Sequence, residues 1–359
     1  MSTASQLDSS AYHPPTWEAI LAAHARIAPR IHRTPVLTSS SLDALTGARL
    51  FFKCDNFQKT GSFKIRGATN TIFSLTDQEA AKGIVTQSSG NHGAAVARAA
   101  GWRGVPAWIV MPRNAPAVKI KAIENYGGKI VFCEPKVSAR KETCDRVQAE
   151  TGAYLVHPYD DDRIIAGQAT AAKELLEEVP DLDAVLAPVS GGGLLSGTCL
   201  SAKSMRPEIH VFGCEPERAD DAYRSLTTGV LQSLESSDTI ADGLRASLAP
   251  RTFAILRRNV DRVLLVSEAE IISSARLIWE RMKIIIEPSS AVAVAPLLRL
   301  GVVASLNLPK RSMERRRNSA SSSPAAMSTC LLFPSDRFPL QGHDIEDSGQ
   351  QPERRAPFV

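Results

Sequence analysis

The sequence predicts an α/β protein with open, mostly parallel sheets. From Gly83 onward, short apolar runs rich in Val, Ile and Ala alternate with helical patterns of roughly 10–18 residues, which is typical of βαβ units. Gly, Pro, Ser or Asn residues bound these segments, as expected for connections between strands and helices. The series occurs twice along the chain, which predicts two open, twisted parallel-sheet domains. In such folds a ligand binds in the crevice outside the carboxyl ends of the strands.

The composition is that of an ordinary globular protein and excludes several classes of function. The 359 residues are 43% hydrophobic and 22% charged, which is enough chain for two domains. The net charge of +4 and the lack of a basic stripe with interleaved aromatic residues argue against nucleic-acid binding. No apolar run approaches the roughly 20 residues of a membrane span, and residues 1–16 lack the apolar core of a signal peptide. Six cysteines without a CxxC pair predict a reduced, cytoplasmic protein.

The first elements precede the regular series. An apolar face predicts a helix over residues 16–27, which ends before Pro29. A short capped helix is expected at 41–45, and the apolar run 49–54 predicts a strand. The next helix is expected at 64–75, directly after a Gly-Ser turn.

The regular series then supplies the remaining elements. The predicted strands are 84–86, 107–111, 129–133, 154–157, 184–188, 211–214 and 262–266. The predicted helices are 91–100, 117–126, 137–150, 163–178, 194–205, 219–226, 252–259, 268–283 and 289–300. After Leu300 the chain is charged and then low in complexity, so we expect residues 301–359 to be a disordered tail.

The first candidate for chemistry is Lys64, at the expected start of a helix and between two apolar side chains. Burial and the positive end of the helix both favour the neutral amine. A neutral amine is the form that attacks an aldehyde, so Lys64 suits a Schiff base with pyridoxal phosphate (PLP). The alternative is a surface lysine whose stem lies along apolar surface. The rest of the chain has to decide between the two.

Two loops that join a strand to a helix are candidates for anion binding. In the first, Ser88-Ser89-Gly90-Asn91-His92, the amides lie at a helix N-terminus and suit a substrate carboxylate. Taken alone, this pattern fits ordinary helix capping better. In the second, Ser190-Gly191-Gly192-Gly193-Leu194, three consecutive glycines are entropically expensive for a plain turn. Amides wrapped around a phosphate explain them better, and the absence of a nucleotide fingerprint favours a monophosphate.

A fourth candidate, an acidic loop, follows the strand predicted at 211–214. Glu215 and Asp221, with the carbonyl of Ala219 between them, offer oxygen ligands for a hard divalent cation. Acids that cap the first turn of a helix are an equally good explanation of this spacing.

Together these motifs resemble the fold-type II PLP enzymes, and in particular the eukaryotic serine racemases within that family, which also contains serine and threonine dehydratases. The likeness extends from about residue 27 to 300 and includes SFKIRGA, SSGNHG and SGGGLLSG in that order. It implies a tryptophan synthase β-like fold with the cofactor in the cleft between two domains. The implied boundaries are 1–76 with 162–300 for a large PLP-binding domain and 77–161 for a small one.

The resemblance also implies a role for each motif. Lys64 would form the Schiff base with PLP and act as the base on one face of the substrate, while Ser89 would be the acid/base on the other. Asn91 would contact the PLP hydroxyl, and the loop from Ser190 to Leu194 would hold its phosphate. The acidic loop would bind Mg²⁺ or Ca²⁺. Similar enzymes are homodimers that a divalent cation and ATP stimulate.

The implied reaction is racemisation of serine together with its β-elimination to pyruvate and ammonia. Racemisation needs acid/base groups on both faces of the substrate, whereas elimination can use one. Threonine dehydratases typically carry alanine where Ser89 stands, so Ser89 and the acidic loop favour a serine racemase. The alternatives are a threonine or 3-hydroxyaspartate dehydratase, and a catalytically impaired PLP-binding protein.

The chain departs from the family after Leu300. The family has a last core strand and an SGGN motif whose serine contacts the pyridine nitrogen, and this sequence has no such motif. Residues 321–330 have one possible set of codons that, read from the third base, encodes Val-Leu-Ser-Gly-Gly-Asn-Val-Asp-Leu. We therefore hypothesise a frameshift or wrongly assigned splice between about residues 300 and 321, which sequencing of the transcript tests. As written, the chain is expected to lose a buried strand and to be unstable or weakly active.

Overall fold

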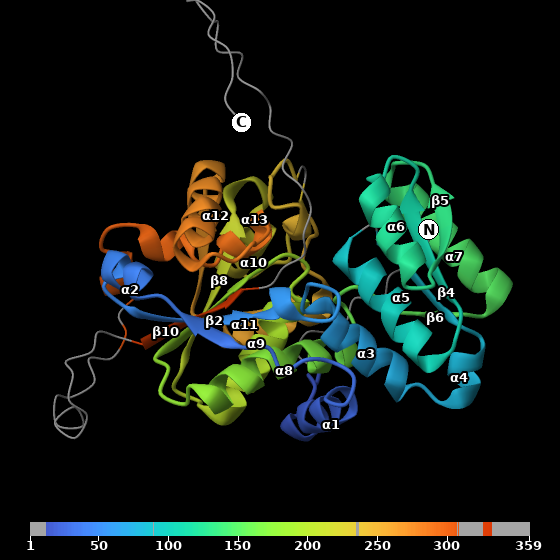
Figure 1. Cartoon of the computed structure of the whole chain (residues 1–359), viewed down its shortest axis with the longest axis horizontal. Coiled ribbons are helices and arrows are strands. Elements are labelled where there is room, and N and C mark those ends of the chain that lie inside the picture. The colour runs from blue at the N-terminus through green and yellow to red at the C-terminus, as the bar shows by residue number, and fades with distance from the viewer. Residues whose placement is uncertain (1–11, 89, 235–236, 307, 309–325, 332–359) are drawn as a thin grey trace, which may run out of the picture.

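Two parallel sheets organise the molecule, and helices cover both faces of each sheet (Figure 1). The structure is a computed structural model, and it describes residues 12–88, 90–234, 237–306, 308 and 326–331. The predicted α/β class with parallel sheets is confirmed. Among the described residues, no helix is both long and apolar enough to cross a membrane.

The larger sheet has six strands in the order β1-β2-β10-β7-β8-β9. The strands are β1 Val36–Thr38, β2 Arg49–Cys54, β7 Ala184–Pro188, β8 His210–Pro216, β9 Arg262–Val266 and β10 Ala326–Leu331. β1 is antiparallel to β2, and every other neighbouring pair is parallel. The smaller sheet is all parallel, in the order β5-β4-β3-β6. Its strands are β3 Ile84–Gln87, β4 Ala107–Pro112, β5 Lys129–Cys133 and β6 Tyr154–Leu155.

Helices and short helical turns connect these strands. The α-helices are α1 Trp17–Ile27, α2 Ser40–Thr46, α3 Lys64–Ser74, α4 Asp77–Ala81, α5 Asn91–Arg103, α6 Ala117–Asn125, α7 Val137–Thr151, α8 Asp162–Glu178, α9 Gly193–Met205, α10 Asp221–Thr228, α11 Pro250–Asn259, α12 Glu268–Met282, α13 Pro288–Ala291 and α14 Val302–Ser305. The 3-10 turns are η1 Asp55–Phe57, η2 Glu217–Ala219, η3 Asp242–Leu244 and η4 Ala295–Leu298.

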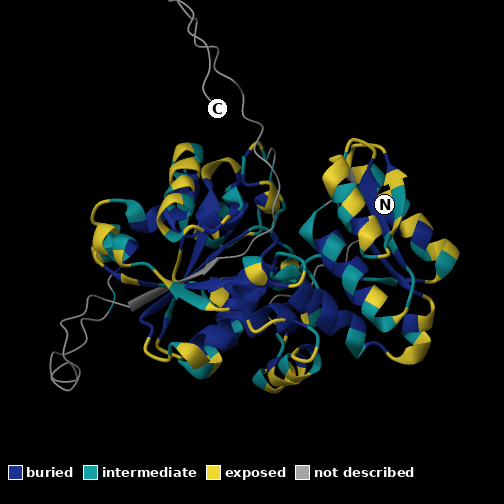
Figure 2. Ribbon diagram, viewed as in Figure 1, coloured by how far each residue is buried: buried dark blue, intermediate teal, exposed yellow. Residues whose placement is uncertain are grey.

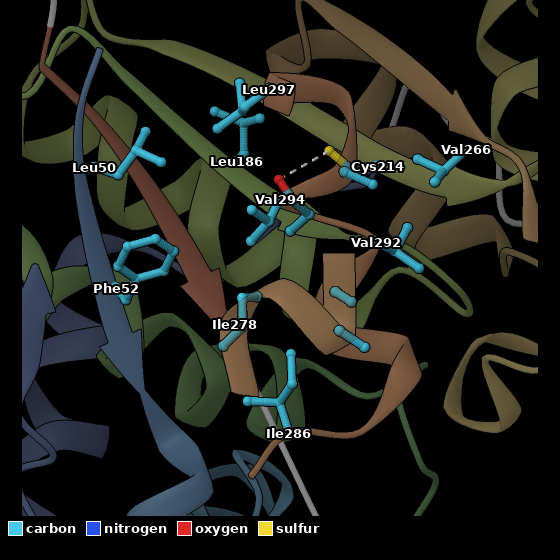
Figure 3. Packing of buried hydrophobic residues seen from close by; sticks show 14 of the residues in the cluster. Leu50, Phe52, Leu186, Cys214, Val266, Ile278, Ile286, Val292, Val294 and Leu297 are labelled. Carbon is cyan, nitrogen blue, oxygen red and sulfur yellow. Dashed lines mark hydrogen bonds between the residues drawn. The ribbon is translucent and has the colours of Figure 1, made fainter. Parts of the chain in front are cut away.

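Alternate residues of the large-sheet strands enter two different cores, because successive side chains of a strand point to opposite faces. On one face, Leu50, Phe52 and Leu186 pack with Ile278 of α12 and Val292 after α13 (Figure 3). The opposite face of the sheet packs against α8, α9 and α11. Figure 2 shows the result: central strands such as β7 and β8 and the inner helix faces are buried, while the outer faces of the helices are exposed.

The segment 326–331 corrects the expectation for the end of the chain. It forms strand β10, which lies between β2 and β7 and pairs in parallel with both. The prediction of disorder over 301–359 is therefore wrong for β10 and for α14. The expected loss of a core strand is wrong for the same reason. A segment that fills this gap satisfies the backbone groups that β2 and β7 would otherwise leave unpaired.

Three smaller differences have local causes. The helix predicted at 289–300 is broken into α13 and η4, because Pro296 cannot continue the hydrogen-bond pattern of a helix. Strand β1 and helix α4 were not predicted from the sequence. Both are short, and α4 depends on a capping box between Thr76 and Glu79 rather than on an apolar face.

Candidate active site

Lys64 begins α3, the helix that packs against α5 beside the small sheet and against α8 beside the large one. Its Nζ donates a hydrogen bond to the carbonyl oxygen of Pro158 at 2.9 Å. Burial lowers the pKa of Lys64 from its ordinary 10.5 to about 8, although the charge of Glu287 acts in the opposite direction. At neutral pH a far larger fraction of this amine is neutral than that of an exposed lysine.

A buried ion network fixes the first turn of α3. The Arg66 guanidinium is fully buried and donates to both carboxylate oxygens of Asp55, at 2.6 and 2.8 Å. It also donates to both oxygens of Glu174 on α8, at 2.8 and 3.0 Å. Lys53 adds a second contact to Glu174 at 2.7 Å. Two buried cations thus face two buried carboxylates, and α3 is tied to η1 and to α8.

Close contact of two glycines holds the same helices together. A Cβ on Gly167 of α8 would lie 2.6 Å from the Cα of Gly67 on α3, so neither helix accepts a larger residue there. The amide of Gly67 also donates to the side chain of Gln168 at 3.2 Å. Lys64 therefore starts a helix whose position relative to α8 is closely defined.

Two neutral histidines lie near the Lys64 amine. The ring of His92 places Nε2 3.1 Å from the carbonyl oxygen of Val156. The Nδ1 of His157 accepts the amide protons of Tyr159 at 3.3 Å and Asp160 at 2.8 Å, which leaves its proton on Nε2. Burial, helped by the charge of Lys64, lowers the pKa of His92 to about 3 and that of His157 to about 4. Both rings are therefore uncharged at pH 7.

The predicted substrate loop leads into α5, which begins at Asn91 and has no side-chain cap. Its first-turn amides are thus free of a capping side chain, as a carboxylate site requires. Ser88 accepts the amide proton of Gly90 at 3.2 Å, and Asn91 donates to Glu287 at 3.5 Å. The predicted acid/base residue Ser89 lies outside the described residues.

The predicted phosphate loop lies between β7 and α9. Gly192 is the N-cap residue of α9 and has a φ of +86°, a conformation that favours glycine. No side chain caps this helix either. The hydroxyl of Ser190 donates to the carbonyl oxygen of Ala246 at 3.1 Å and accepts its amide proton at 3.0 Å. Uncapped amides at the start of a long helix fit a phosphate group.

Packing also requires the three glycines. A Cβ on Gly191 would lie 2.4 Å from the ring of Tyr159, and one on Gly193 would lie 2.9 Å from the Cβ of Tyr159. A Cβ on Gly192 would lie 2.7 Å from the side chain of Thr252. The glycine run therefore has a steric reason in addition to the phosphate-binding one that the sequence indicated.

The two side chains among the three predicted cation ligands, Glu215 and Asp221, are buried and close to each other. Glu215 accepts the amide protons of Ala222 at 3.0 Å and Tyr223 at 2.8 Å. One oxygen of Asp221 accepts the amide proton of Leu248 at 2.8 Å, and the other has no hydrogen-bond partner. A buried carboxylate oxygen without a partner is unfavourable unless a ligand or a proton completes it.

The electrostatics of this pair agree with a cation site. Burial raises the pKa of Glu215 well above its usual value, and the charge of Asp221 raises it further. Burial also raises the pKa of Asp221, to about 6. Among the described residues no three His, Cys, Asp or Glu side chains cluster as metal ligands. A cation here would complete its shell with carbonyl oxygens, such as the predicted one of Ala219, and with water. Two buried carboxylates of this kind fit a hard divalent cation.

A separate pocket of about 390 Å³ opens between the start of α2 and the end of α12. Four hydroxyl groups and one guanidinium line it, together with two apolar residues, and the full lining is Leu37, Thr38, Ser39, Ser40, Ser41, Arg281 and Met282. This mixture suits a ligand that carries an anionic group.

Sequence reasoning missed several residues of the Lys64 surroundings. Pro158 contributes a backbone carbonyl, which no side-chain pattern reports. His157 and Tyr159 come two and four residues after the end of β6, so their place after a strand of the small sheet was the available signal. Glu287 comes from the far end of the chain and precedes the short helix α13. An acidic side chain before a proline-initiated helix is typical of ordinary capping, so the pattern around Glu287 does not single it out.

Comparison with known proteins gives one family. The family described as Pyridoxal-phosphate dependent enzyme matches residues 27–307. The beta-hydroxyaspartate dehydratase of Paracoccus denitrificans (strain Pd 1222) is 52% identical over 285 residues, which are 79% of this chain and 90% of that protein. The serine racemase of Oryza sativa subsp. indica is 50% identical over 276 residues, 77% of this chain and 81% of that protein. Among solved structures, maize serine racemase superposes with a TM-score of 0.83 at 43% identity, covering 89% of this chain and 94% of that one.

Proposed function

The chain belongs to the pyridoxal-phosphate dependent enzyme family, and from that premise we propose that it acts on serine, interconverting the L- and D-isomers and also eliminating water to give pyruvate and ammonia. The observation that carries the proposal is the buried Lys64 amine at the start of α3, which has a lowered pKa and donates to the carbonyl oxygen of Pro158. The starts of α5 and α9 both lack a capping side chain, so each offers free amides to an anion. Serine racemases among the relatives support the choice of substrate.

Different residues of the chain would bind different parts of the cofactor and the substrate. Lys64 would join the cofactor covalently, because its amine reaches the neutral form near physiological pH. The amides of Gly192, Gly193 and Leu194 would receive the phosphate, and Asn91 would donate to a ring oxygen. The amides at the start of α5, from Ser88 to His92, would orient the substrate carboxylate.

Pyridoxal phosphate, when bound, supplies an electron sink for the charge that is left when the α-proton departs. Lys64 would take the α-proton from one face of serine, and the Ser89 hydroxyl would return a proton from the other, which inverts the centre. The neutral rings of His92 and His157 add no competing positive charge near Lys64. If the β-hydroxyl leaves instead, a single acid/base group suffices and pyruvate and ammonia result.

The substitution Ser89→Ala tests the two-face assignment. We expect D-serine formation to fall by 10²–10⁴-fold, the usual contribution of one acid/base group, while pyruvate formation persists. Incubation with L-serine, followed by separate assays of D-serine and pyruvate, measures both. Lys64→Ala is the control and should lose both products. Undiminished D-serine formation by Ser89→Ala would show that another group protonates the second face.

A dehydratase of threonine or 3-hydroxyaspartate is the second candidate. The relative from Paracoccus denitrificans, named a beta-hydroxyaspartate dehydratase, favours it. The two proposals differ in their products. A dehydratase would release 2-oxo acid faster from its own substrate than from L-serine and would give no D-isomer.

A third candidate is a catalytically impaired cofactor-binding protein. The missing SGGN motif favours it, because the serine of that motif in the family contacts the pyridine nitrogen of the cofactor and this sequence has no counterpart. Strong cofactor absorbance without turnover would identify this case. A chain in which the alternative reading frame restores Val-Leu-Ser-Gly-Gly-Asn provides the comparison, and we expect it to turn over faster.

We further propose that Mg²⁺ or Ca²⁺ binds at Glu215 and Asp221 and that ATP acts as an activator. The hydroxyls of Ser39 to Ser41 and the guanidinium of Arg281 make the pocket beside α2 our candidate for the phosphates of ATP. Activity assays with and without Mg²⁺-ATP test the activation, and Arg281→Ala tests the pocket.

The organisation of the molecule completes the proposal. We place the division into domains at the predicted boundaries, 77–161 for the small domain and the flanking segments for the large one. Homodimers are proposed by analogy, and exposed apolar side chains such as Leu45 and Ile285 offer contact surface. Of the six cysteines, the five whose side chains the structure describes are buried and form no disulfide, which suits a reducing, cytoplasmic location. Size-exclusion chromatography with light scattering measures the oligomeric state.

A further inference from the structure

The predicted phosphate loop and the predicted cation site begin at neighbouring strand ends. β7 and β8 are paired in parallel, with Pro188 opposite Cys214. The phosphate loop follows β7 and begins at Ser190, while the first cation ligand, Glu215, is the residue after Cys214. The amide of Val189 also donates to the carbonyl of Cys214 at 2.9 Å. The two sites therefore share one edge of the large sheet.

A three-residue stretch, Ala246 to Leu248, contacts both sites, and we call it the bridge segment. At one end, the amide and carbonyl of Ala246 hold the hydroxyl of Ser190 at 3.0 and 3.1 Å. At the other end, the amide of Leu248 donates to Asp221 at 2.8 Å. The side chain of Leu248 also lies under the phosphate loop, since a Cβ on Gly192 would be 2.8 Å from it.

The cation ligands are poorly satisfied by the protein alone. Glu215 is fully buried and Asp221 is 1% exposed, so their mutual repulsion is little screened by water. One oxygen of Asp221 has no hydrogen-bond partner. A divalent cation would satisfy that oxygen and remove the repulsion. It would thereby hold Asp221, and with it the amide of Leu248, in one place.

We propose that the bridge segment couples the two sites, so that a divalent cation at Glu215 and Asp221 strengthens binding of the cofactor's phosphate group at Ser190 to Leu194, and phosphate binding strengthens cation binding equally. This inference rests on the proposed function, because it takes the phosphate loop and the cation site as assigned there. Thermodynamic linkage requires the two effects to be equal in size. The cation thus acts on cofactor retention from a site that does not touch the substrate.

The test is an equilibrium titration of the apoprotein with pyridoxal phosphate, followed by cofactor absorbance, in Mg²⁺ and in chelator. We expect Mg²⁺ to lower the Kd at least about fivefold, the lower end of common coupling factors. Pyridoxal, which lacks the phosphate, is the matched ligand control and should show no response to Mg²⁺. Calorimetric titration with Mg²⁺ should show the same factor when pyridoxal phosphate is present.

Two variants locate the coupling. Ser190→Ala removes both hydrogen bonds to Ala246 and should abolish the effect of Mg²⁺ on cofactor affinity while Mg²⁺ still binds. Ser190→Gly serves as a second version if the alanine variant fails to fold, as judged by circular dichroism. Asp221→Asn should abolish Mg²⁺ binding and its effect together.

The outcomes separate the coupling from the function that it rests on. If Mg²⁺ binds and pyridoxal phosphate binds with unchanged Kd, the coupling is wrong and the proposed function stands. If Mg²⁺ changed the Kd of pyridoxal and of pyridoxal phosphate equally, the coupling would also be wrong, because the phosphate loop would not be involved. Absence of Mg²⁺ binding would overturn both the cation site and the coupling. Absence of cofactor binding would overturn the proposed function itself.

Discussion

At the scale of single residues, the Lys64 amine is subject to two opposing influences. Burial favours the neutral amine and lowers its pKa to about 8, whereas the negative charge of Glu287 favours the protonated form. Asn91 contacts the same carboxylate at 3.5 Å. The charge of Lys64 is thus linked to a residue that comes more than 200 positions later in the chain.

The pH dependence of cofactor attachment follows from this pKa. The neutral fraction of Lys64 rises about tenfold per pH unit below pH 8 and levels off above it. We expect the rate at which the apoprotein combines with pyridoxal phosphate to follow the same curve, as measured by stopped-flow absorbance. A rate that still rises tenfold per unit between pH 9 and 10 would indicate an ordinary lysine, with a pKa near 10.5.

The substitution Glu287→Gln removes the charge that opposes burial. The pKa of Lys64 should then fall below about 8, and the rate curve should move to lower pH. Glu280→Gln, at an exposed position on α12 paired with Arg276, is the matched control and should leave the curve in place. An unchanged curve for Glu287→Gln would mean that this carboxylate does not act on Lys64.

Site residues that belong to a local sequence motif could be predicted from the sequence. Site residues that only the tertiary fold brings close to Lys64 could not. Lys64 and the loop from Ser190 to Leu194 stand out because a lysine between apolar side chains and three glycines in a row are costly without a reason. The same reasoning does not identify Glu287 as a site residue, since an acidic residue before a helix is common. The contact of Lys64 with Pro158 depends on a backbone carbonyl and on the path of the chain after β6.

At the scale of elements, the position of α3 depends on charge as well as on apolar packing. Arg66 and Lys53 face Asp55 and Glu174 in a region closed to water. Burial would raise the pKa of Glu174, but Arg66 and Lys53 outweigh it and lower the pKa to about 2. Glu174 therefore stays ionised at every pH at which the enzyme would work.

Removal of Arg66 should be strongly destabilising. Arg66→Met leaves two buried carboxylates facing a single lysine, and breaking such a pair typically costs about 3–5 kcal/mol. Urea denaturation followed by circular dichroism measures the loss. Arg276→Met, which breaks an exposed pair with Glu280, is the control and should cost less than about 1 kcal/mol. Similar losses for the two variants would contradict the structural role of the network.

The residue that caps the end of α12 has a strained backbone conformation. Lys283 has a φ of +56° and caps the helix in the left-handed region, where glycine is usual. Relief of about 1–2 kcal/mol of strain, partly offset by the greater entropy of glycine in the unfolded chain, should make Lys283→Gly more stable. Arg276→Gly, inside the same helix, should lose about 1 kcal/mol. A lower melting temperature for Lys283→Gly would show that the lysine side chain makes a contribution larger than the strain.

The elements themselves were largely predictable where an apolar run was continuous. β7 is buried along its whole length, so its run of Ala, Val and Leu identified it. The prediction of one helix over 289–300 was wrong because it followed the apolar pattern and neglected Pro296, which interrupts a helix. Strand β10 was not predicted because its residues, Ala326 to Leu331, follow a serine-rich segment that suggested disorder. Only their pairing between β2 and β7 assigns them to a strand.

At the scale of the whole molecule, the large sheet depends on β10. Without it, β2 and β7 would face each other as two open parallel edges, and such edges favour aggregation. The small-sheet side joins the large-sheet side through the apolar packing of α3 against α5 and through polar contacts. One is the ion pair between Lys119 of α6 and Asp242 of η3, at 2.9 Å. The integrity of the cofactor site therefore depends on the completed large sheet.

Truncation tests the role of β10. A chain that ends at residue 325 should be insoluble or aggregated, because it lacks the strand between β2 and β7. A chain that ends at residue 331 retains the strand and is the matched control, which we expect to be monodisperse by size-exclusion chromatography. Normal solubility and cofactor binding in the shorter chain would show that the large sheet forms without β10.

The position of β10 has a consequence for how the protein is made. Its partners β2 and β7 are synthesised long before it, so the growing chain carries the sheet as two separate parts until residues 326–331 leave the ribosome. Pairings over such a sequence separation form slowly, because the chain between them must be ordered first. We expect nascent chains to spend the interval in a partly assembled state with exposed strand edges, and thus to depend on chaperones more than a protein whose central strand comes first.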